Sequence, residues 1–395
     1  MRKRLLFICS SLDGGGVSKS LVSLLSCLDY SRYEADLLLF AHGGLFYSLL
    51  PKEVHVLPQH LPLNLFSPAP LALKSLLHQK EFAWAARRLF HAVLSLCDRG
   101  AAAAWIAKQL PTLPGIYDAA IDFNGQHVLY FMIEKVSAKN KFSFFHSDYK
   151  KWPHYYRADK YYFAQADAVI TVSELCLRSL QEVFPEHRKK FHMMHNIVSP
   201  GSIRQLARNG HGFADAAFKG TRILTIGHPC SRKGTDLAIE ACAKLVSEGY
   251  DIRWHILGDS TEVIKYRRIV EARGLIDRFI FHGALLNPYP YLSQTDIYCH
   301  PARFEGKPLA VDEAKVLARA IVVTNFSTAP DQISHERNGL IVDLSAEAIC
   351  SGIKRLIDNP ALRETFSRNL QEECTGNEAE VLKLYELIER DSECA

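Results

Sequence analysis

The sequence predicts an α/β protein of two doubly wound domains, each a parallel sheet with helices on both faces. Short apolar runs typical of buried strands alternate with segments of helical periodicity along almost the whole chain. A length of 395 residues suits two domains, and 48% hydrophobic with 23% charged residues is typical of a soluble globular protein. We expect residues 1–200 to form the first domain and 201–376 the second. A helix within residues 377–395 is expected to cross back towards the first domain.

The first half begins with a strand and contains an extended helical stretch. Its predicted strands are Leu5–Cys9, Asp36–Phe40, Tyr117–Phe123, Lys141–His146 and Ala168–Ser173. Residues 58–75 hold four prolines and are expected to form a loop or lid, followed by helical periodicity to residue 110. That stretch mixes large apolar residues with Lys and Arg. It either rests on anionic lipid or packs on the sheet with its basic residues in solvent, and we favour the second interpretation.

Three glycines follow the first predicted strand. Gly14, Gly15 and Gly16 permit unusual φ values and close approach of the backbone to a ligand, although a flexible turn would use them too. They do not form a GxGxxG motif, and no acidic residue stands at a strand end about 20 positions further on. A nicotinamide site is therefore a poor interpretation, and Gly15 and Gly16 are kept as candidate contacts to another phosphate-bearing ligand.

A histidine and a basic aromatic segment follow the predicted strand Lys141–His146. Ligands of α/β sheets bind at the carboxyl ends of strands, so His146 is a candidate hydrogen-bond donor to a sugar or phosphate. The alternative is an ordinary surface histidine. Further candidates, for a rim that contacts an acceptor or a membrane, are Lys150, Lys151, Trp152 and Arg157.

The net charge of +4 conceals an asymmetry between the two halves. Residues 1–200 hold 23 Lys/Arg and 16 Asp/Glu, a net charge of +7, whereas residues 201–395 hold 24 and 27, a net charge of −3. A basic first half suggests contact with an anionic membrane surface or a phosphate-bearing acceptor. Nucleic acid is not expected as a partner, because no Arg/Lys-rich block with interleaved aromatic residues occurs.

The second half repeats the strand–helix rhythm. Its predicted strands are Arg222–Gly227, Ile252–Leu257, Phe279–His282, Asp296–His300, Ala320–Val323 and Leu340–Val342, and its last predicted helices are Ala346–Asp358, Ala361–Gln371 and Glu378–Arg390. Residues 203–220 are polar with little periodicity, so we expect an irregular entry to the domain.

A cationic loop follows the first strand of this half, with the sequence GHPCSRKG at residues 227–234. Such a loop between a strand and a helix can hold a diphosphate, because charge-assisted hydrogen bonds add to the helix dipole. The candidate phosphate-binding residues are Gly227, His228, Arg232 and Lys233.

A second junction lies in residues 298–323, where a strand-like run turns through EGKP into a helix. Glu305 opens the turn and Glu313 follows eight residues later, two turns into the predicted helix. Pro308 suits a first helical turn, and the N–H groups of such a loop offer a phosphate site. The alternative is an ordinary turn with two solvated glutamates.

The Glu-x7-Glu pattern in FEGKPLAVDEAK resembles the donor-site signature of the retaining glycosyltransferases of family four (GT4), which have the GT-B fold. The resemblance covers nearly all of the second half, but the first half only in layout, in the Gly-rich loop and at His146. It implies two Rossmann-like domains facing each other across a cleft. The implied activity is retaining transfer of a sugar from a nucleotide-sugar donor, with a UDP-sugar more expected than a GDP-sugar and no metal or other cofactor.

The resemblance also assigns roles to the candidates. The developing phosphate charge would be stabilised by Lys233, by Arg232 or His228, and by the segment Gly306, Lys307, Pro308 and Leu309. Glu313 would accept hydrogen bonds from the ribose, Glu305 would contact the transferred sugar, and His146 the sugar or acceptor. The glycines Gly15 and Gly16 would approach the donor diphosphate.

One position departs from the family pattern. The family has Arg directly after the strand glycine, where this chain has His228. Two alternatives therefore stay open, a catalytically silent GT-B partner protein and a GT-B sugar-nucleotide epimerase. The layout is most similar to bacterial enzymes of capsule, exopolysaccharide or lipopolysaccharide synthesis, which implies a lipid-linked saccharide acceptor.

Other classes and locations are disfavoured by the sequence. No Asp-x-Asp occurs, which disfavours the metal-dependent glycosyltransferase fold. The ten cysteines form no CxxC pair, as expected of a cytosolic chain with reduced thiols. No apolar run approaches a membrane span, and the apolar core near the start is too short for a signal peptide. We expect a cytoplasmic protein, either free or peripheral on the inner face of the membrane.

Overall fold

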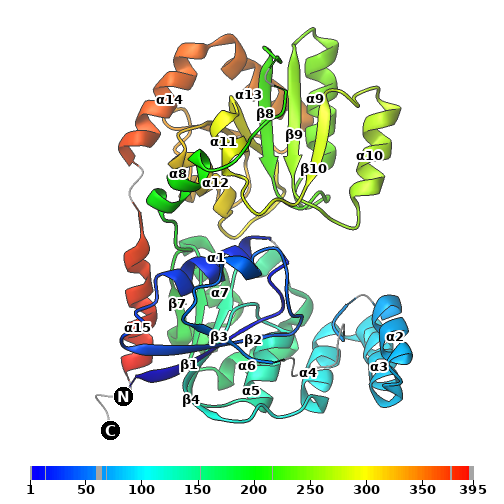
Figure 1. Cartoon of the computed structure of the whole chain (residues 1–395), viewed down its shortest axis with the longest axis vertical. Helices are drawn as coiled ribbons and strands as arrows, with labels where there is room; N and C mark the ends of the chain where they lie inside the picture. Colours follow the sequence, from blue (N-terminus) through cyan, green and yellow to red (C-terminus); the bar gives the residue numbers. More distant parts are fainter. Residues whose placement is uncertain are drawn as a thin grey trace. The chain divides into compact units, whose positions relative to one another are not determined.

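The computed structural model describes residues 2–13, 15–58, 65–67, 69–151, 153–215, 217–373 and 376–390. The chain divides into two compact units, and the first combines Met1–Asn196 with Ala379–Ala395. The second unit is Ile197–Glu378. Each unit is built on one parallel sheet, as the sequence predicts, and the elements of both are labelled in Figure 1.

Unit 1 contains a seven-stranded sheet in the order β3-β2-β1-β4-β5-β6-β7. The strands are β1 (Lys3–Cys9), β2 (Tyr33–Leu39), β3 (Val54–Val56), β4 (Ile116–Asp122), β5 (Ser137–Phe145), β6 (Ala168–Thr171) and β7 (Phe191–Met193). Every neighbouring pair is parallel. Since helices cover both faces of a parallel sheet, strands such as β1 are almost continuously apolar and buried.

The helices of unit 1 surround this sheet. They are α1 (Gly15–Ser26), α2 (Ala69–His78), α3 (Phe82–Cys97), α4 (Arg99–Gln109), α5 (His127–Lys135), α6 (Tyr156–Gln165) and α7 (Glu174–Val183), with short 3-10 turns at Tyr47–Leu49, Tyr149–Lys151, Pro153–Tyr155 and Pro185–Lys190. The core joins strand residues such as Leu6 and Ile8 to Leu129 and Phe131 of α5. Caps fix two helix starts: Asp98 accepts from the Ala101 amide at 2.9 Å, and Ser173 from the Cys176 amide at 3.3 Å.

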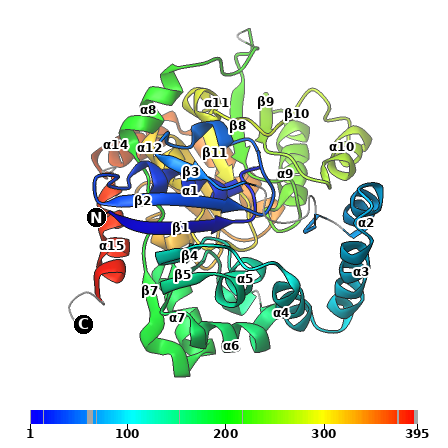
Figure 2. The ribbon, with the colours of Figure 1, turned by 60° about the horizontal axis from the view of Figure 1, so that its bottom comes forward.

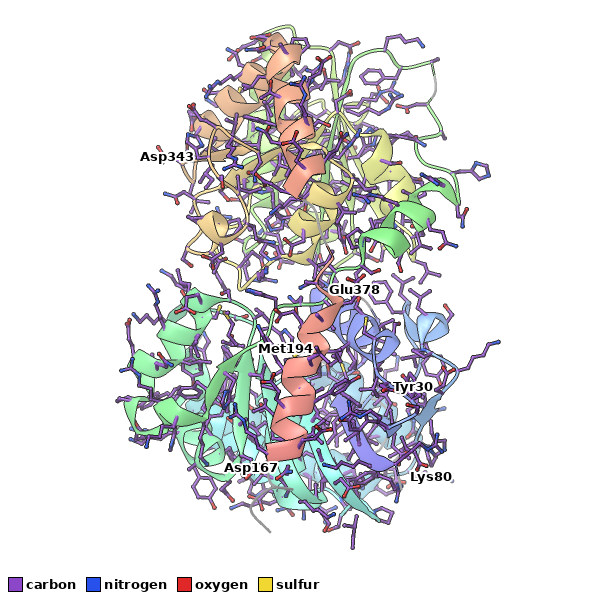
Figure 3. All side chains as sticks on the ribbon, turned by 90° about the vertical axis from the view of Figure 1, so that its left-hand side faces the viewer. Tyr30, Lys80, Asp167, Met194, Asp343 and Glu378 are labelled. Carbon is purple, nitrogen blue, oxygen red and sulfur yellow. The ribbon has the colours of Figure 1, made fainter. Side chains whose placement is uncertain are left out.

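The last described helix, α15 (Val381–Glu389), belongs to unit 1 and follows a 3-10 turn at Glu378–Glu380. Figure 3 shows it lying along one side of this unit. Its Tyr385 hydroxyl accepts from the Asp29 amide at 2.7 Å, and its ring stacks on Tyr33 at 4.8 Å. Glu389 accepts from the Tyr33 hydroxyl at 2.8 Å and pairs with Arg32. These contacts fix the chain's last described residues on the edge formed by β2.

The predicted helical stretch after residue 70 differs from our expectation in one respect. It forms three helices, α2, α3 and α4, and α3 contacts α2 and α4 while α4 contacts α5 and α6. Our favoured interpretation had basic residues in solvent and apolar ones inside. In α3, however, Arg88 and His91 are buried, whereas Leu89 and Val93 are exposed.

Unit 2 contains a six-stranded sheet in the order β10-β9-β8-β11-β12-β13. The strands are β8 (Thr221–Ile226), β9 (Ile252–Leu257), β10 (Phe279–Gly283), β11 (Ile297–His300), β12 (Ala320–Thr324) and β13 (Leu340–Val342). After β10 the chain returns to the other side of β8, so the strand order reverses between β8 and β11. Such a switch point, at the carboxyl ends of the strands, is where open α/β sheets bind ligands.

Helices cover both faces of this sheet as well. They are α8 (Pro200–Arg208), α9 (Thr235–Ser247), α10 (Val263–Ala272), α11 (Tyr289–Gln294), α12 (Leu309–Val316), α13 (Ala346–Asp358) and α14 (Pro360–Glu373), with a 3-10 turn at Ala329–Asp331. Alternate residues of β11 enter opposite cores, Cys299 on the side of α9 and α13 and Tyr298 on the side of α11 and α12. Helix α8 replaces part of the predicted irregular entry, because Pro200 starts it and Ile203 is buried.

None of the helices in the described part of the chain has both the length and the apolar character needed to cross a bilayer.

Candidate active site

Two loops meet at the switch point of unit 2. Residues 227–234 join β8 to α9, and residues 301–308 join β11 to α12. Because β8 and β11 are paired, with Ile223 opposite Ile297, both loops leave the same edge of the sheet. The Arg303 amide donates to the Arg232 carbonyl at 2.8 Å, and the Arg303 guanidinium pairs with Asp236 at 2.6 Å. These bonds fix one loop against the other.

A glycine allows the two loops to approach closely. Gly234 has φ +67°, and a Cβ at this position would lie 1.8 Å from the carbonyl oxygen of Pro301. Any side chain here would therefore both strain the backbone and push the loops apart. The resulting close approach brings the residues that precede Gly234 next to those that follow Pro301.

Glu305 is the centre of the contacts between the loops. It is 8% exposed, its carboxylate accepts from the Lys233 ammonium, and the Arg232 guanidinium lies 3.3 Å away. Burial by itself would raise the pKa of this carboxyl. The charge of Lys233, the hydrogen bond from His300 and the charge of Arg232 outweigh burial, and they hold the pKa of Glu305 well below its usual range. Glu305 is thus a buried anion beside two cations.

His300 and Tyr298 lie behind Glu305 on the same face of β11. Burial raises the pKa of Tyr298 well above its usual value, so its hydroxyl stays protonated and donates to His300 Nδ1 at 3.0 Å. Burial also lowers the pKa of His300, despite the opposing hydrogen bond to Glu305, and the ring is neutral near pH 7. The ring proton is therefore on Nε2, which donates to Glu305 Oε1 at 3.4 Å.

The backbone around Glu305 is held by side chains from the segment after β12. The Thr328 hydroxyl donates to the Glu305 carbonyl at 3.1 Å, and the Gln332 amide donates to the Pro308 carbonyl at 3.1 Å. Helix α12 starts directly after Pro308, so its first N–H groups face the end of this loop. Of the predicted segment, Gly306, Pro308 and Leu309 are buried, and Lys307 is half-buried.

Glu313, the second predicted glutamate, lies within α12. It is 3% exposed, and its carboxylate accepts from the Tyr289 hydroxyl of α11 at 3.2 Å. The neutral Tyr289 hydroxyl is the hydrogen-bond donor given for Glu313, whereas Glu305 contacts two cations. The two glutamates thus have different electrostatic surroundings.

His228 occupies an exposed position directly after Gly227, which has φ +153° and approaches the side chain of Lys233. Its Nδ1 donates to the carbonyl of Asp259 at 2.6 Å, in the loop that follows β9. A carbonyl can only accept, so Nδ1 is protonated and Nε2 is the nitrogen left for another partner.

The predicted residues of unit 1 lie at the carboxyl ends of its strands. Gly15 starts α1 with φ +85°, and a Cβ at Gly16 would meet no protein atom within 4 Å. His146 follows β5, where its Nε2 donates to the Phe123 carbonyl at 3.2 Å. Burial lowers the pKa of His146 to about 4, against the effect of this hydrogen bond, so the ring is neutral near pH 7 with Nδ1 as an acceptor.

Two groups of site residues were not singled out from the sequence. Asp122, fully buried at the end of β4, accepts from the amides of Asn124 and Gly125 at 2.8 and 2.9 Å and from Ser143 at 2.6 Å. Burial raises its pKa to about 7, although these hydrogen bonds act against the rise. The other group is the pair behind Glu305. An acidic residue at the end of an apolar run, and polar residues two apart on a strand, are the signals that could have found them.

The predicted rim of unit 1 is partly described. Lys150 pairs with Glu182, and its amide lies 3.1 Å from the side-chain oxygens of Asp148 and Ser179. Lys151 is exposed, and Arg157 lines a surface hollow between α3 and α6. Trp152 lies outside the described residues.

Sequence comparison links the second unit to known proteins. Residues 215–373 match the family described as Glycosyl transferases group 1. An uncharacterized glycosyltransferase of Haemophilus influenzae is 28% identical over 198 residues, which cover 50% of this chain and 53% of the relative. The alpha-D-kanosaminyltransferase of Streptomyces kanamyceticus is 26% identical over 150 residues, covering 37% and 39%. A capsular polysaccharide biosynthesis glycosyltransferase, CapM of Staphylococcus aureus, is 25% identical over 150 residues, covering 36% and 38%.

These alignments span about half or less of each relative's own length, whereas similarity to solved structures extends over the whole chain. Anabaena HepE, in complex with UDP-glucose, superposes with a TM-score of 0.68 at 15% identity and full coverage of both chains. The lipopolysaccharide glycosyltransferase WaaG gives a TM-score of 0.65 at 15% identity, with 99% of each chain covered. The chain therefore has the GT-B fold, and residues 215–373 match a glycosyl transferases group 1 domain.

Proposed function

We propose that this chain is a retaining glycosyltransferase of family four that transfers a sugar from a nucleotide-sugar donor to a lipid-linked saccharide in surface polysaccharide synthesis. The observation that carries the proposal is the cluster of Lys233, Arg232 and buried Glu305 at the switch point of unit 2. Two cations and the start of α12 suit a diphosphate, and a carboxylate beside them suits the hydroxyls of a sugar.

In the proposed reaction, the bond between the anomeric carbon and the β-phosphate oxygen breaks, and a bond to the acceptor oxygen forms on the same face of the sugar. The leaving nucleoside diphosphate gains negative charge, which Lys233, Arg232 or His228 and the first amides of α12 would stabilise. The acceptor's proton would go to the departing phosphate oxygen, so no protein base is required. Two cations already present at the phosphate site would make a metal unnecessary.

Each carboxylate and histidine has a separate proposed task. Glu313 would accept hydrogen bonds from the ribose, and Glu305 would hold the transferred sugar and offset oxocarbenium-like charge. His300 would position Glu305, because its Nε2 proton is directed at one carboxylate oxygen. In unit 1, the Nδ1 atom of His146 would accept a hydrogen bond from a hydroxyl of the sugar or acceptor, and Gly15 and Gly16 would let the donor approach the backbone.

The proposed donor is a UDP-sugar. Supporting it, similar solved structures are described in complex with UDP or UDP-glucose, Anabaena HepE and Staphylococcus aureus TarM among them. The proposed acceptor follows relatives whose names refer to capsule, colanic acid and O-antigen biosynthesis. A lipid-linked acceptor would place the protein on the inner face of the cytoplasmic membrane.

The test begins with thermal unfolding in the presence of UDP-, GDP- and ADP-sugars, since ligands that bind the native state raise its melting temperature. The stabilising donor is then incubated with saccharide acceptors, and the anomeric configuration of the product is read by NMR. Transfer with retention supports the proposal. Binding without turnover would instead indicate a silent partner protein, and an isomerised donor would indicate an epimerase.

A further inference from the structure

Helix α3 of unit 1 presents an apolar face to solvent. Its exposed residues Phe82, Leu89, Phe90, Val93 and Leu96, the α3 face, are each more than half exposed, and Leu96 is 87% exposed. Their spacing places them within an arc of about 120° along four turns of the helix. Scattered exposed apolar residues are normal, but a continuous stripe of large ones marks an interaction surface.

The opposite side of α3 explains why this stripe stays outside. Arg88 is buried there, and its guanidinium donates to the carbonyls of Leu65 and Ser67, both at 3.0 Å, and lies 3.2 Å from His91 Nδ1. Turning the helix would expose these satisfied groups' partners and bury the charge elsewhere without acceptors. The polar side therefore anchors α3, and the apolar side is left free.

The position of α3 within unit 1 leaves its stripe accessible. Helix α3 packs on α4 and α2, and α4 in turn packs on α5 and α6. Figures 1 and 2 both show α2 and α3 on the outer side of α4, away from the sheet of unit 1. Helix α2 adds exposed Leu71 and Leu77 to the same hairpin.

Basic residues accompany the α3 face. Residues 69–99 contain five Lys/Arg and two Asp/Glu, and one of the acids, Asp98, is engaged as the cap of α4. A hollow of about 410 Å³ opens at the end of α3, with Leu96, Arg99, His154, Tyr156 and Arg157 among its walls. Among the described residues, neither Arg99 nor Arg157 has an ion-pair partner. An apolar stripe that ends in a cationic hollow combines the two features of a helix that lies on an anionic membrane.

We propose that the α3 face docks on an anionic lipid bilayer, with its apolar side chains in the boundary between headgroups and acyl chains and with Arg99 and Arg157 on lipid phosphates. The charges favour this occupant over a second copy of the chain, because two copies joined through this face would bring like charges together. The inference deepens the proposed function, since it locates the surface that meets the membrane of a lipid-linked acceptor. It can be tested without any transfer reaction.

The experiment is co-sedimentation of the full chain with vesicles of phosphatidylcholine alone and of phosphatidylcholine mixed with phosphatidylglycerol. The wild type should bind the anionic vesicles, and Leu89→Ser with Val93→Ser should weaken binding at least about tenfold, because several buried methylene equivalents are lost. The matched control is Ile264→Ser, an equally exposed apolar residue of α10, which should bind like the wild type.

A second comparison isolates the charges. Arg99→Gln with Arg157→Gln should weaken binding to anionic vesicles by about fivefold per charge and leave binding to phosphatidylcholine unchanged, while the exposed Arg268→Gln serves as control. Wild-type binding by the Leu89/Val93 variant would overturn the proposal. So would a wild type that ignores vesicles but self-associates through this face. Transfer to a soluble acceptor should be unchanged in the Leu89/Val93 variant, so loss of vesicle binding is separable from failure of the proposed activity.

Discussion

Replacing Glu305 by Gln tests the central assignment, because it removes one charge and keeps the volume of the side chain. If Glu305 holds the transferred sugar, kcat should fall at least about tenfold, about 1.4 kcal/mol of transition-state stabilisation. Binding of the product UDP should change in the opposite direction. Lys233 and Arg232 would no longer be engaged by a carboxylate and would be available to the diphosphate, so the affinity for UDP should rise by up to about tenfold.

The effect of Glu305→Gln on folding can be bounded from the same contacts. Breaking a fully buried ion pair costs about 3–5 kcal/mol. The side chains of Lys233 and Arg232 are 16% and 37% exposed, so water solvates both in the variant, and the Arg232 pair contributes little after screening. We expect a loss of about 1–2 kcal/mol in the free energy of unfolding. Denaturant titration measures this loss, and calorimetric titration with UDP measures the affinity.

The pH dependence of that stability difference has a defined sign. The folded pKa of Glu305 is below its unfolded value, so the ionised group stabilises the fold fully above the unfolded pKa and loses this effect as pH falls through the folded pKa. The difference between wild type and Glu305→Gln should therefore be constant near neutral pH and shrink below about pH 4.

A matched control for this experiment is Glu313→Gln, which alters another buried carboxylate of the same unit. If Glu313 binds the ribose, this variant should weaken the affinity for UDP about tenfold, because hydrogen bonds to a charged acceptor are lost. The two Glu→Gln variants should thus shift UDP affinity in opposite directions. Unchanged transfer in Glu305→Gln, or equal weakening of UDP binding in both variants, would refute the assignment of the two glutamates.

Three further variants test the surroundings of this cluster. His300→Phe should lower kcat about tenfold with little change in KM, because Glu305 loses a directed donor, whereas His300→Gln should restore much of kcat; equal loss in both would exclude a positioning role. His228→Arg should tighten UDP binding several-fold in a salt-sensitive manner, and unchanged calorimetric affinity would contradict a phosphate contact at this position. Gly234→Ala should lower the free energy of unfolding by about 2 kcal/mol or more, whereas Gly249→Ala, with φ +87° and open space around it, should cost only about 1 kcal/mol; equal denaturant midpoints would contradict the steric reasoning.

The two-sheet fold could be predicted from the sequence because its signals are local. An apolar run, a glycine-containing turn and a helical repeat lie within about 25 consecutive residues, so each junction can be recognised without knowledge of the others. The structure confirms the GT-B architecture and places the loops of Lys233 and Glu305 on neighbouring strands. Their ion pair joins residues 72 positions apart, and its geometry depends on Gly234 contacting Pro301, which no local pattern specifies.

The orientation of α3 could not be predicted in the same way. Periodicity shows that one side of this helix is apolar and the other polar, and the usual inference places the apolar side inside. Here Arg88 is buried because carbonyls of Leu65 and Ser67, more than 20 residues earlier, accept its hydrogen bonds. Tertiary contacts of this kind override the pattern, and the reversed orientation is itself the sign of an interaction surface.

The pairing of Lys233 with Glu305 also explains how a phosphate site can stay folded before its ligand arrives. A largely buried ammonium without a counter-charge would be costly, and Glu305 supplies that charge at the switch point. A nucleoside diphosphate brings negative charge of its own, so it can replace the carboxylate as the partner of Lys233 and Arg232. Glu305 would then be released towards the sugar while His300, neutral and held by Tyr298, keeps its orientation. Donor binding and positioning of the carboxylate are thus one exchange of partners, and a ligand with less phosphate charge should complete that exchange less well.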